Sequence, residues 1–280
     1  MYRVLNKVVG WLGRLFGVMP PSDQARGGAG DALPVARTTV GLCFDFAPGI
    51  GFESAREADI GLDLILGKLN EMRLTATFFC PAKLCETMPG RLEQIASRGH
   101  ELGCLGYADE EPRKLTEDAL AQMIIACRSA FERRGWKPAG YRYPHSDWDA
   151  RLNAVLPRQQ FIYHAHHDHA KHPYRVARGP DLVRVPICTD DRGLRRRQET
   201  VNLTLSKHLR YLRKAIARGT YVAVAFHPAI LAEDPDHMSH WEEWVRAAVR
   251  SRADVGPLVR ALPEALRPVS SEPAAKREKT

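Results

Sequence analysis

The 280-residue chain lacks several features that would place it in a special class. No apolar run reaches the roughly 18 residues that a membrane-spanning helix needs. Its six cysteines form no CxxC pair, and most lie in apolar surroundings, which indicates buried reduced thiols. Reduced thiols are typical of a reducing compartment. We therefore expect a cytoplasmic protein, with membrane association left open by the N-terminal segment described below.

Acidic residues are too few to balance the basic ones. The net charge is +8 and the isoelectric point is about 9.3, which favours an anionic partner. Much of the excess lies at 192–197 and at 207–218, where the basic residues fall at helical spacing opposite leucines. This spacing is typical of a solvated helix face. Because no nucleic-acid-binding motif accompanies it, we expect no nucleic-acid partner.

The first residues carry no acid at all. Residues 1–19 contain three basic positions among apolar ones, which predicts a basic amphipathic helix over 1–21, followed by a linker at 22–37. Lys7 and Arg14 interrupt the apolar run, so the segment is a poor signal peptide. Such a helix binds in the plane of an anionic membrane or packs on its own domain, and both interpretations stay open.

Strands and helices are predicted to alternate from residue 38 to 267, and the polar stretch 268–280 is predicted to be a disordered tail. The expected strands are 39–46, 75–80, 99–104, 141–143, 161–166, 182–187 and 221–226. The expected helices are 54–73, 89–97, 116–134, one over the basic segment before residue 221, 238–250 and 256–266. Repeated strand–helix units predict a mostly parallel sheet, closed or nearly closed.

Three ionisable residues stand at the carboxyl ends of expected strands. They are Asp45, Arg142 and His227. A buried acid is costly unless something uses it, and chemistry collects at this end of the strands in α/β folds. An acid can serve as general base, an arginine can orient it, and a histidine can donate a proton to a leaving group. Each residue alone is more often a structural polar group, so the argument depends on the three together.

Several segments resemble the polysaccharide deacetylase superfamily, carbohydrate esterase family 4. The order is Val40–Asp45, Ala76–Cys80, Gly99–Gly103, Tyr141–Pro144 and Val222–Pro228, with ATFF and GHELG the most specific runs. The resemblance covers roughly 38–265 and implies a distorted (β/α)7 barrel. Its members hydrolyse the N-acetyl groups of chitin, peptidoglycan and similar sugars, and relatives cleave formamides or ring amides.

The resemblance also implies roles for single residues. Asp45 matches the catalytic base, Arg142 the arginine that orients it, and His227 the catalytic acid. The segment after the arginine implies substrate contacts by Tyr143, Pro144 and His145, although the family usually has an aromatic residue where His145 stands.

The metal ligands are where the chain departs from this family. The family's metal, zinc, sits on one aspartate and two histidines, and the matching positions here hold Phe46, Leu105 and Asp109. We therefore predict that the zinc is lost and that no cofactor replaces it. Two apolar replacements at touching positions also predict that Phe46 and Leu105 lie within about 4.5 Å of each other, filling the vacated site.

The size of this loss bears on function. A catalytic metal lowers the pKa of bound water from about 15.7 to about 7, on the order of 12 kcal/mol. A general base and acid alone contribute about 10²–10⁴ in rate. Three interpretations therefore survive: a metal held by other residues, an easier electrophile than an acetamide, or a domain that binds without turnover. Other metal ligands are offered by His164 and His166, which share a face of their strand, although a His-x-His pair is a weak pattern.

These considerations lead to one principal hypothesis and one alternative. The principal hypothesis is a hydrolase that acts on a non-peptide C–N bond of a sugar or related amide. The alternative is a catalytically inactive member of the fold that binds a glycan or a lipid-linked sugar. The expected partner is accordingly a glycan or another amide-bearing small molecule, with residues 1–19 offering contact to an anionic membrane surface.

Overall fold

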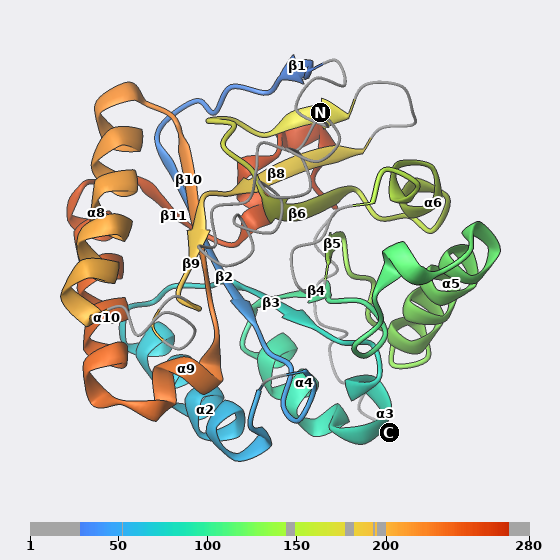
Figure 1. Cartoon of the computed structure of the whole chain (residues 1–280). Helices are drawn as coiled ribbons and strands as arrows, with labels where there is room; N and C mark the ends of the chain where they lie inside the picture. The colour runs from blue at the N-terminus through green and yellow to red at the C-terminus, as the bar shows by residue number, and fades with distance from the viewer. Residues whose placement is uncertain are drawn as a thin grey trace, which may run out of the picture.

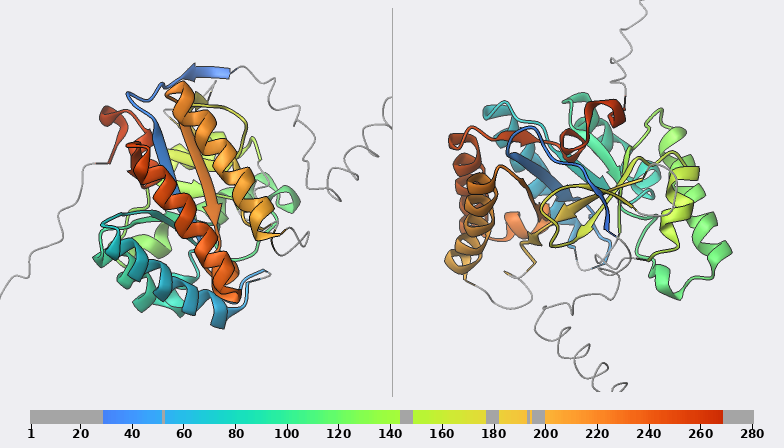
Figure 2. Two further views of the ribbon diagram at one scale, coloured as in Figure 1. Left: turned by 90° about the vertical axis from the view of Figure 1, so that its left-hand side faces the viewer. Right: turned by 90° about the horizontal axis from the view of Figure 1, so that it is seen from above.

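The computed structural model describes residues 29–51, 53–143, 149–176, 182–192, 194 and 200–268. In these ranges parallel strands form a curved sheet with helices around it (Figures 1 and 2). The strands that build the barrel are β2 (Thr39–Asp45), β3 (Thr77–Cys80), β4 (Glu101–Cys104), β5 (Gly140–Arg142), β6 (Tyr163–His167), β8 (Val183–Ile187), β9 (Thr189–Asp190) and β10 (Tyr221–Phe226). The α/β fold predicted from the sequence is confirmed.

The barrel closes through one irregular seam. β8 pairs with β6 on one side, and the chain then continues through Cys188 into β9, which pairs with β10. The Cys188 amide donates a hydrogen bond to the Ala223 carbonyl at 3.0 Å. β8 and β9 together thus act as the seventh strand and join the two ends of the sheet. Only a short stretch of β10 takes part, which makes the barrel distorted.

The helices lie outside the strands, as Figure 1 shows for α8 and α10 on one side and α5 on the other. Their bounds are α2 (Ala55–Glu71), α3 (Leu84–Thr87), α4 (Pro89–Ser97), α5 (Glu117–Glu132), α6 (Leu152–Arg158), α8 (Val201–Arg218), α9 (Pro228–Glu233) and α10 (Pro235–Arg250). Thr116 caps α5 by accepting a hydrogen bond from the Ala119 amide at 3.2 Å, as its sequence context predicts. In the described part of the chain no helix is long and apolar enough to cross a membrane.

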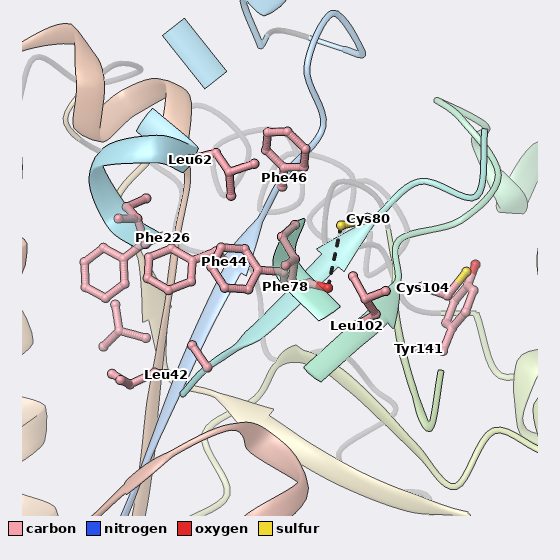
Figure 3. Close-up of a cluster of buried hydrophobic side chains, with 14 of the residues drawn as sticks. Leu42, Phe44, Phe46, Leu62, Phe78, Cys80, Leu102, Cys104, Tyr141 and Phe226 are labelled. Carbon is pink, nitrogen blue, oxygen red and sulfur yellow. Dashed lines mark hydrogen bonds between the residues drawn. The ribbon is translucent and has the colours of Figure 1, made fainter. Parts of the chain in front are cut away.

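Side chains of β2 alternate between two layers of core. Leu42, Phe44 and Phe46 belong to the outer layer, between the strands and the helices, together with Leu62 of α2 (Figure 3). Cys43 and Ala47 belong to a separate cluster inside the barrel. This alternation follows from the pleat of a strand, whose successive side chains point to opposite faces. It places Asp45 on the inner face, at the carboxyl end of the strand.

The amino-terminal end of the barrel is filled by the chain after β11 (Asp254–Gly256), which pairs with β2. Leu258 of the 3₁₀ turn η4 (Leu258–Ala261) packs into the inner cluster. Half-buried Glu101 holds this region together because it bonds the Thr77 hydroxyl at 2.6 Å and the Tyr163 hydroxyl at 2.8 Å. The acid of the GHELG run therefore has a structural role.

Two predictions about the ends of the domain are wrong. The helix predicted over 256–266 is instead part of β11 followed by η4 and η5 (Glu264–Leu266), because Pro257 and Pro263 interrupt helical hydrogen bonding. The linker predicted over 22–37 contains β1 (Ala29–Ala32), which pairs antiparallel with β7 (Tyr174–Val176). The amphipathic helix predicted over 1–21 lies outside the described residues, and so does nearly all of the predicted tail.

α2 and α9 approach unusually closely. A Cβ atom added to Gly61 of α2 would lie 2.0 Å from the carbonyl oxygen of Pro228, the first residue of α9. Only glycine allows the two backbones to meet at this distance. The contact matters because His227 is the residue immediately before α9.

Candidate active site

An ion pair joins two of the predicted residues on the inner face of the barrel. The Nε of Arg142 lies 2.7 Å from Oδ1 and 2.9 Å from Oδ2 of Asp45. The two residues end β2 and β5, and both are buried. Burial opposes ionisation of Asp45, but Arg142 and His227 outweigh it and hold the pKa of the carboxyl well below its usual range.

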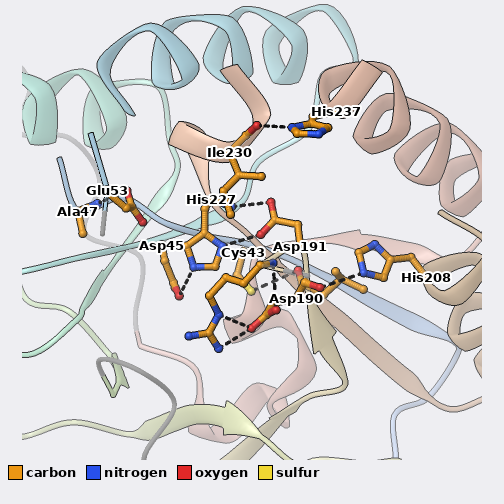
Figure 4. Close-up of polar contacts among 12 residues, drawn as sticks. Cys43, Asp45, Ala47, Glu53, Asp190, Asp191, His208, His227, Ile230 and His237 are labelled. Carbon is orange, nitrogen blue, oxygen red and sulfur yellow. Dashed lines mark hydrogen bonds and ion pairs between the residues drawn. The ribbon is translucent and has the colours of Figure 1, made fainter. Parts of the chain in front are cut away.

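His227 completes this group from the end of β10. Its Nε2 lies 3.5 Å from Oδ2 of Asp45, and its Nδ1 lies 2.6 Å from Oδ1 of Asp191 (Figure 4). Burial would lower the pKa of the imidazole, yet the carboxylates of Asp191 and Asp45 raise it to about 10. His227 is therefore an imidazolium at neutral pH, with its Nε2 proton directed at Asp45.

Asp191 is a site residue that the sequence analysis missed. It follows β9 directly and is fully buried, and its Oδ2 also accepts the backbone N–H of His227 at 3.0 Å. The available signal was the acid pair Asp190–Asp191 shortly after the expected strand 182–187. A buried acid at that end of a strand is costly unless something uses it, and the same reasoning pointed to Asp45.

A recess opens beside the three residues. Its empty volume is about 410 Å³, part of which is open to solvent. Among the described residues its polar lining consists of Asp45, Glu53, Asp109, Arg192 and His227, and its apolar lining includes Ile50 and Leu105. Glu53, which the sequence analysis also missed, is 6% exposed. Its Oε2 accepts a hydrogen bond from the Ala47 amide at 3.3 Å, and burial raises its pKa to about 7.

A second polar layer supports the recess. Asp190 binds Nε of Arg192 at 2.6 Å and Nε2 of His167 at 2.9 Å. The backbone carbonyl of Asp190 lies 3.2 Å from Nε2 of His208 on α8. These contacts fix the strand–turn segment that carries Asp191 and position the guanidinium of Arg192 at the edge of the recess.

Of the predicted substrate-contact segment, the structure describes only Tyr143. Tyr143 is buried in the outer core layer with Tyr141, because it alternates with the inward-facing Arg142. It is not among the described residues that line the recess. Pro144 and His145 lie outside the described residues.

The residues at the family's metal position do not fit a metal ion. Phe46 is fully buried in the outer layer and directs no atom into the recess, whereas Leu105 belongs to the inner cluster. The predicted contact between Phe46 and Leu105 is therefore wrong, because the strand pleat sends them to opposite sides of the sheet. Asp109 is exposed and lines the recess, and one carboxylate is too few donors for a divalent ion.

The predicted alternative ligands, His164 and His166, do lie together. Their Nδ1 atoms are 3.2 Å apart, and their rings are stacked on the face of β6 opposite to the inward-facing Tyr163 and Ala165. The Nε of Arg184 lies 3.5 Å from Nε2 of His164, and this cation disfavours a metal ion. Within the described ranges, no group of three or more His, Cys, Asp or Glu side chains could hold a metal.

Comparison with known proteins agrees with the fold. The polysaccharide deacetylase family profile matches residues 33–163. The chain is 27% identical over 163 residues to a peptidoglycan deacetylase of Helicobacter pylori, covering 57% of this chain and 45% of that protein. Residues 33–163 thus resemble the polysaccharide deacetylase family, from which they diverge in sequence. The match spans less than half the length of this curated relative.

Solved structures of deacetylase relatives show the same fold. A Mycobacterium smegmatis protein assigned to the polysaccharide deacetylases has a TM-score of 0.69 at 22% identity, covering 82% of this chain and 90% of that one. A Bacillus anthracis protein described as a pseudoenzyme of carbohydrate esterase family 4 has a TM-score of 0.58 at 15% identity, covering 82% and 66%. The deacetylase fold thus occurs in a chain described as inactive.

Proposed function

We propose that this chain hydrolyses a non-peptide C–N bond, the N-acyl amide of a sugar or a related amide, without the metal of its superfamily. The observation that carries the proposal is that Asp45 and His227 line one recess, where Arg142 pairs with Asp45. A carboxylate, an arginine that orients it and a proton-donating histidine are groups that general acid–base hydrolysis of an amide can use. The peptidoglycan deacetylase of Helicobacter pylori supports a glycan as the partner.

The geometry assigns a part of the reaction to each group. Asp45 accepts a hydrogen bond from the attacking water, and either it or a second carboxyl at the recess takes the proton. His227, held protonated by Asp191, gives the proton on Nε2 to the leaving nitrogen. Arg142 keeps Asp45 ionised and fixed in place.

The donor set at the metal position favours a second candidate, a domain that binds a glycan or lipid-linked sugar without turnover. Phe46 and Leu105 supply no ligand, so the substantial rate contribution of a metal-bound hydroxide is missing. An N-formyl amide or a ring amide, being more electrophilic than an acetamide, requires less activation. The two candidates differ in a single measurable property, which is turnover.

One experiment separates them. The purified full chain is incubated with N-acetylated and N-formylated chitin oligosaccharides and with peptidoglycan fragments, and released amine and carboxylate are measured. Hydrolysis that Asp45→Asn and His227→Ala each abolish, with both variants folded by circular dichroism, supports the enzyme. Binding of the same oligosaccharides with no product supports the binding domain. Turnover that survives in either variant contradicts the assigned roles.

We also propose that the protein is cytoplasmic and that residues 1–19 attach it to anionic membrane surfaces. The proposal rests on the basic amphipathic sequence, which lies outside the described residues. A chain lacking residues 1–19 should no longer co-sediment with anionic vesicles. Equal sedimentation with and without that segment contradicts the proposal.

A further inference from the structure

Glu53 is a buried carboxyl beside the ion pairs of the site. It lies in the loop between β2 and α2, and its backbone is anchored by hydrogen bonds at both ends: the Gly49 amide donates to its carbonyl at 3.1 Å, and its own amide donates to Ile50 at 3.3 Å. Its Oε2 accepts from the Ala47 amide, and the carboxyl lines the same recess as Asp45 and His227. Such a group is costly to keep there unless it is used.

Asp45 is poorly suited to accept a proton. Its two oxygens are held by Arg142, and Oδ2 also faces the imidazolium of His227. If Asp45 took up a proton, its carboxylate would lose its negative charge. Both cations would then lose their ion pair with it. A general base works best when its proton affinity matches the working pH, and a metal-free site cannot rely on acidified water. The recess therefore needs a more basic group.

We infer that Glu53 is the proton acceptor of the reaction, with Asp45 retained to orient the water and to keep His227 protonated. This inference rests on the proposed function. The water oxygen attacks the amide carbon, and Glu53 takes one of its protons while the other stays on the hydroxyl of the acid product. The C–N bond breaks as Nε2 of His227 protonates the nitrogen, giving the free amine. Exchange with solvent then removes the proton from Glu53 and returns one to His227.

The charged groups around Glu53 come from several elements. His227 precedes α9, Asp45 ends β2, Asp191 follows β9, and Asp109 and Arg192 line the recess. The positive charge of His227 favours the ionised form of Glu53. The negative charges of Asp45 and Asp191 oppose it. Burial is the largest influence and raises the pKa of Glu53 to about 7. The carboxylate is therefore available at neutral pH while His227 still holds its proton.

The pH dependence of kcat/KM on N-formylated and N-acetylated chitin oligosaccharides tests this inference, because it reports the free enzyme. Activity should rise with pH through a midpoint near 7 as Glu53 ionises, and fall near 10 as His227 loses its proton. Glu53→Gln keeps the shape but cannot take a proton, so kcat/KM should fall by about 10²–10⁴ and the lower midpoint should vanish. Glu53→Asp, which retains a carboxylate, should keep part of the activity. Its pH profile should still show the lower of the two midpoints.

Glu71→Gln is the matched control, because it makes the same change on an exposed face of α2 and should leave the profile unaltered. Wild-type activity with no midpoint near 7, or a Glu53→Gln variant that hydrolyses at the wild-type rate, would overturn the role of Glu53 and leave the proposed function standing. Failure of the wild-type protein to hydrolyse any of these substrates would overturn both.

Discussion

The Nδ1 of His227 lies 2.6 Å from Oδ1 of Asp191, and the same carboxylate accepts the backbone N–H of His227 through its other oxygen at 3.0 Å. Asp191 thereby fixes both the ring and the main chain of the residue that would supply the proton. The carboxylate comes from the seam of the barrel and the imidazole from β10. The seam that closes the sheet therefore also places the carboxylate that orients His227 and keeps it protonated.

Asp191→Asn should lower the pKa of His227 from about 10 toward its ordinary range near 6.5, because the amide carries no negative charge. It should also destabilise the fold by about 3–5 kcal/mol, the usual cost of breaking a buried pair from one side. Histidine titration by NMR and denaturant unfolding measure the two effects. The exposed control Asp63→Asn should alter neither, and an unmoved His227 titration would refute the proposed coupling.

Glu53 should make stability depend on pH in a predictable direction. The folded-state pKa of about 7 lies above the ordinary value of 4.5, so the folded protein holds this proton more tightly than the unfolded chain. Stability contributed by the protonated form is complete below about 4.5 and is lost as pH rises to about 7. The unfolding free energy of wild type relative to Glu53→Gln should therefore fall by roughly 3 kcal/mol across that window and then stay constant.

Chemical denaturation of both proteins between pH 4.5 and 8 measures this difference. Groups that are common to the two proteins cancel in the comparison. A pH-independent difference would show that Glu53 titrates as an ordinary exposed carboxyl. This test needs no turnover, so it is independent of the substrate.

Gly61→Ala should destabilise the protein and reduce activity. Its new Cβ would lie 2.0 Å from the Pro228 carbonyl oxygen, so α9 must move, and overpacking of this kind typically costs about 1–3 kcal/mol. Because His227 immediately precedes α9, the displacement should reach the site. Gly67→Ala in the same helix has no atom within 4 Å of its new Cβ and should instead stabilise by about 0.5–1 kcal/mol. Equal thermal stability of the two variants would contradict the close approach.

Protein dialysed against zinc should retain much less than one ion per chain. The position of the family's metal offers one exposed carboxylate, Asp109, and a structural ion needs about three ligands or more. Elemental analysis of wild type and of the His164→Ala/His166→Ala double variant makes the comparison. One zinc per chain in both proteins would place a metal at the family's position after all. Zinc bound by the wild type alone would identify the histidine pair as its ligands.

The sequence was sufficient for the regular part of the fold. Apolar runs and their breakers predicted α4 at Pro89–Ser97 and placed β2, β3 and β10 within about two residues, because burial and backbone sterics act locally. The ends of those strands also supplied Asp45, Arg142 and His227. The final helix, predicted from apolar spacing over 256–266, is wrong because Pro257 and Pro263 within it interrupt helical hydrogen bonding.

Other parts of the site depend on contacts that sequence spacing does not encode. Asp191 acts through a bond to a residue 36 positions away, and its place depends on how the irregular seam closes. Glu53 lies in a loop whose hydrogen bonds turn its side chain inward. The direction of the Phe46 side chain does not follow from its position in the motif, because the pleat of β2 decides the face to which each side chain points.

The burial of Phe46 has a consequence for any attempt to build a metal site at this position. Because Phe46 lies in the aromatic layer between β2 and α2, an acid placed there would be an unpaired charge among hydrocarbon. A Phe46→Asp substitution is therefore expected to destabilise the fold before it supplies any ligand. A donor on the inner face of the barrel, where Leu105 lies, would face no such barrier.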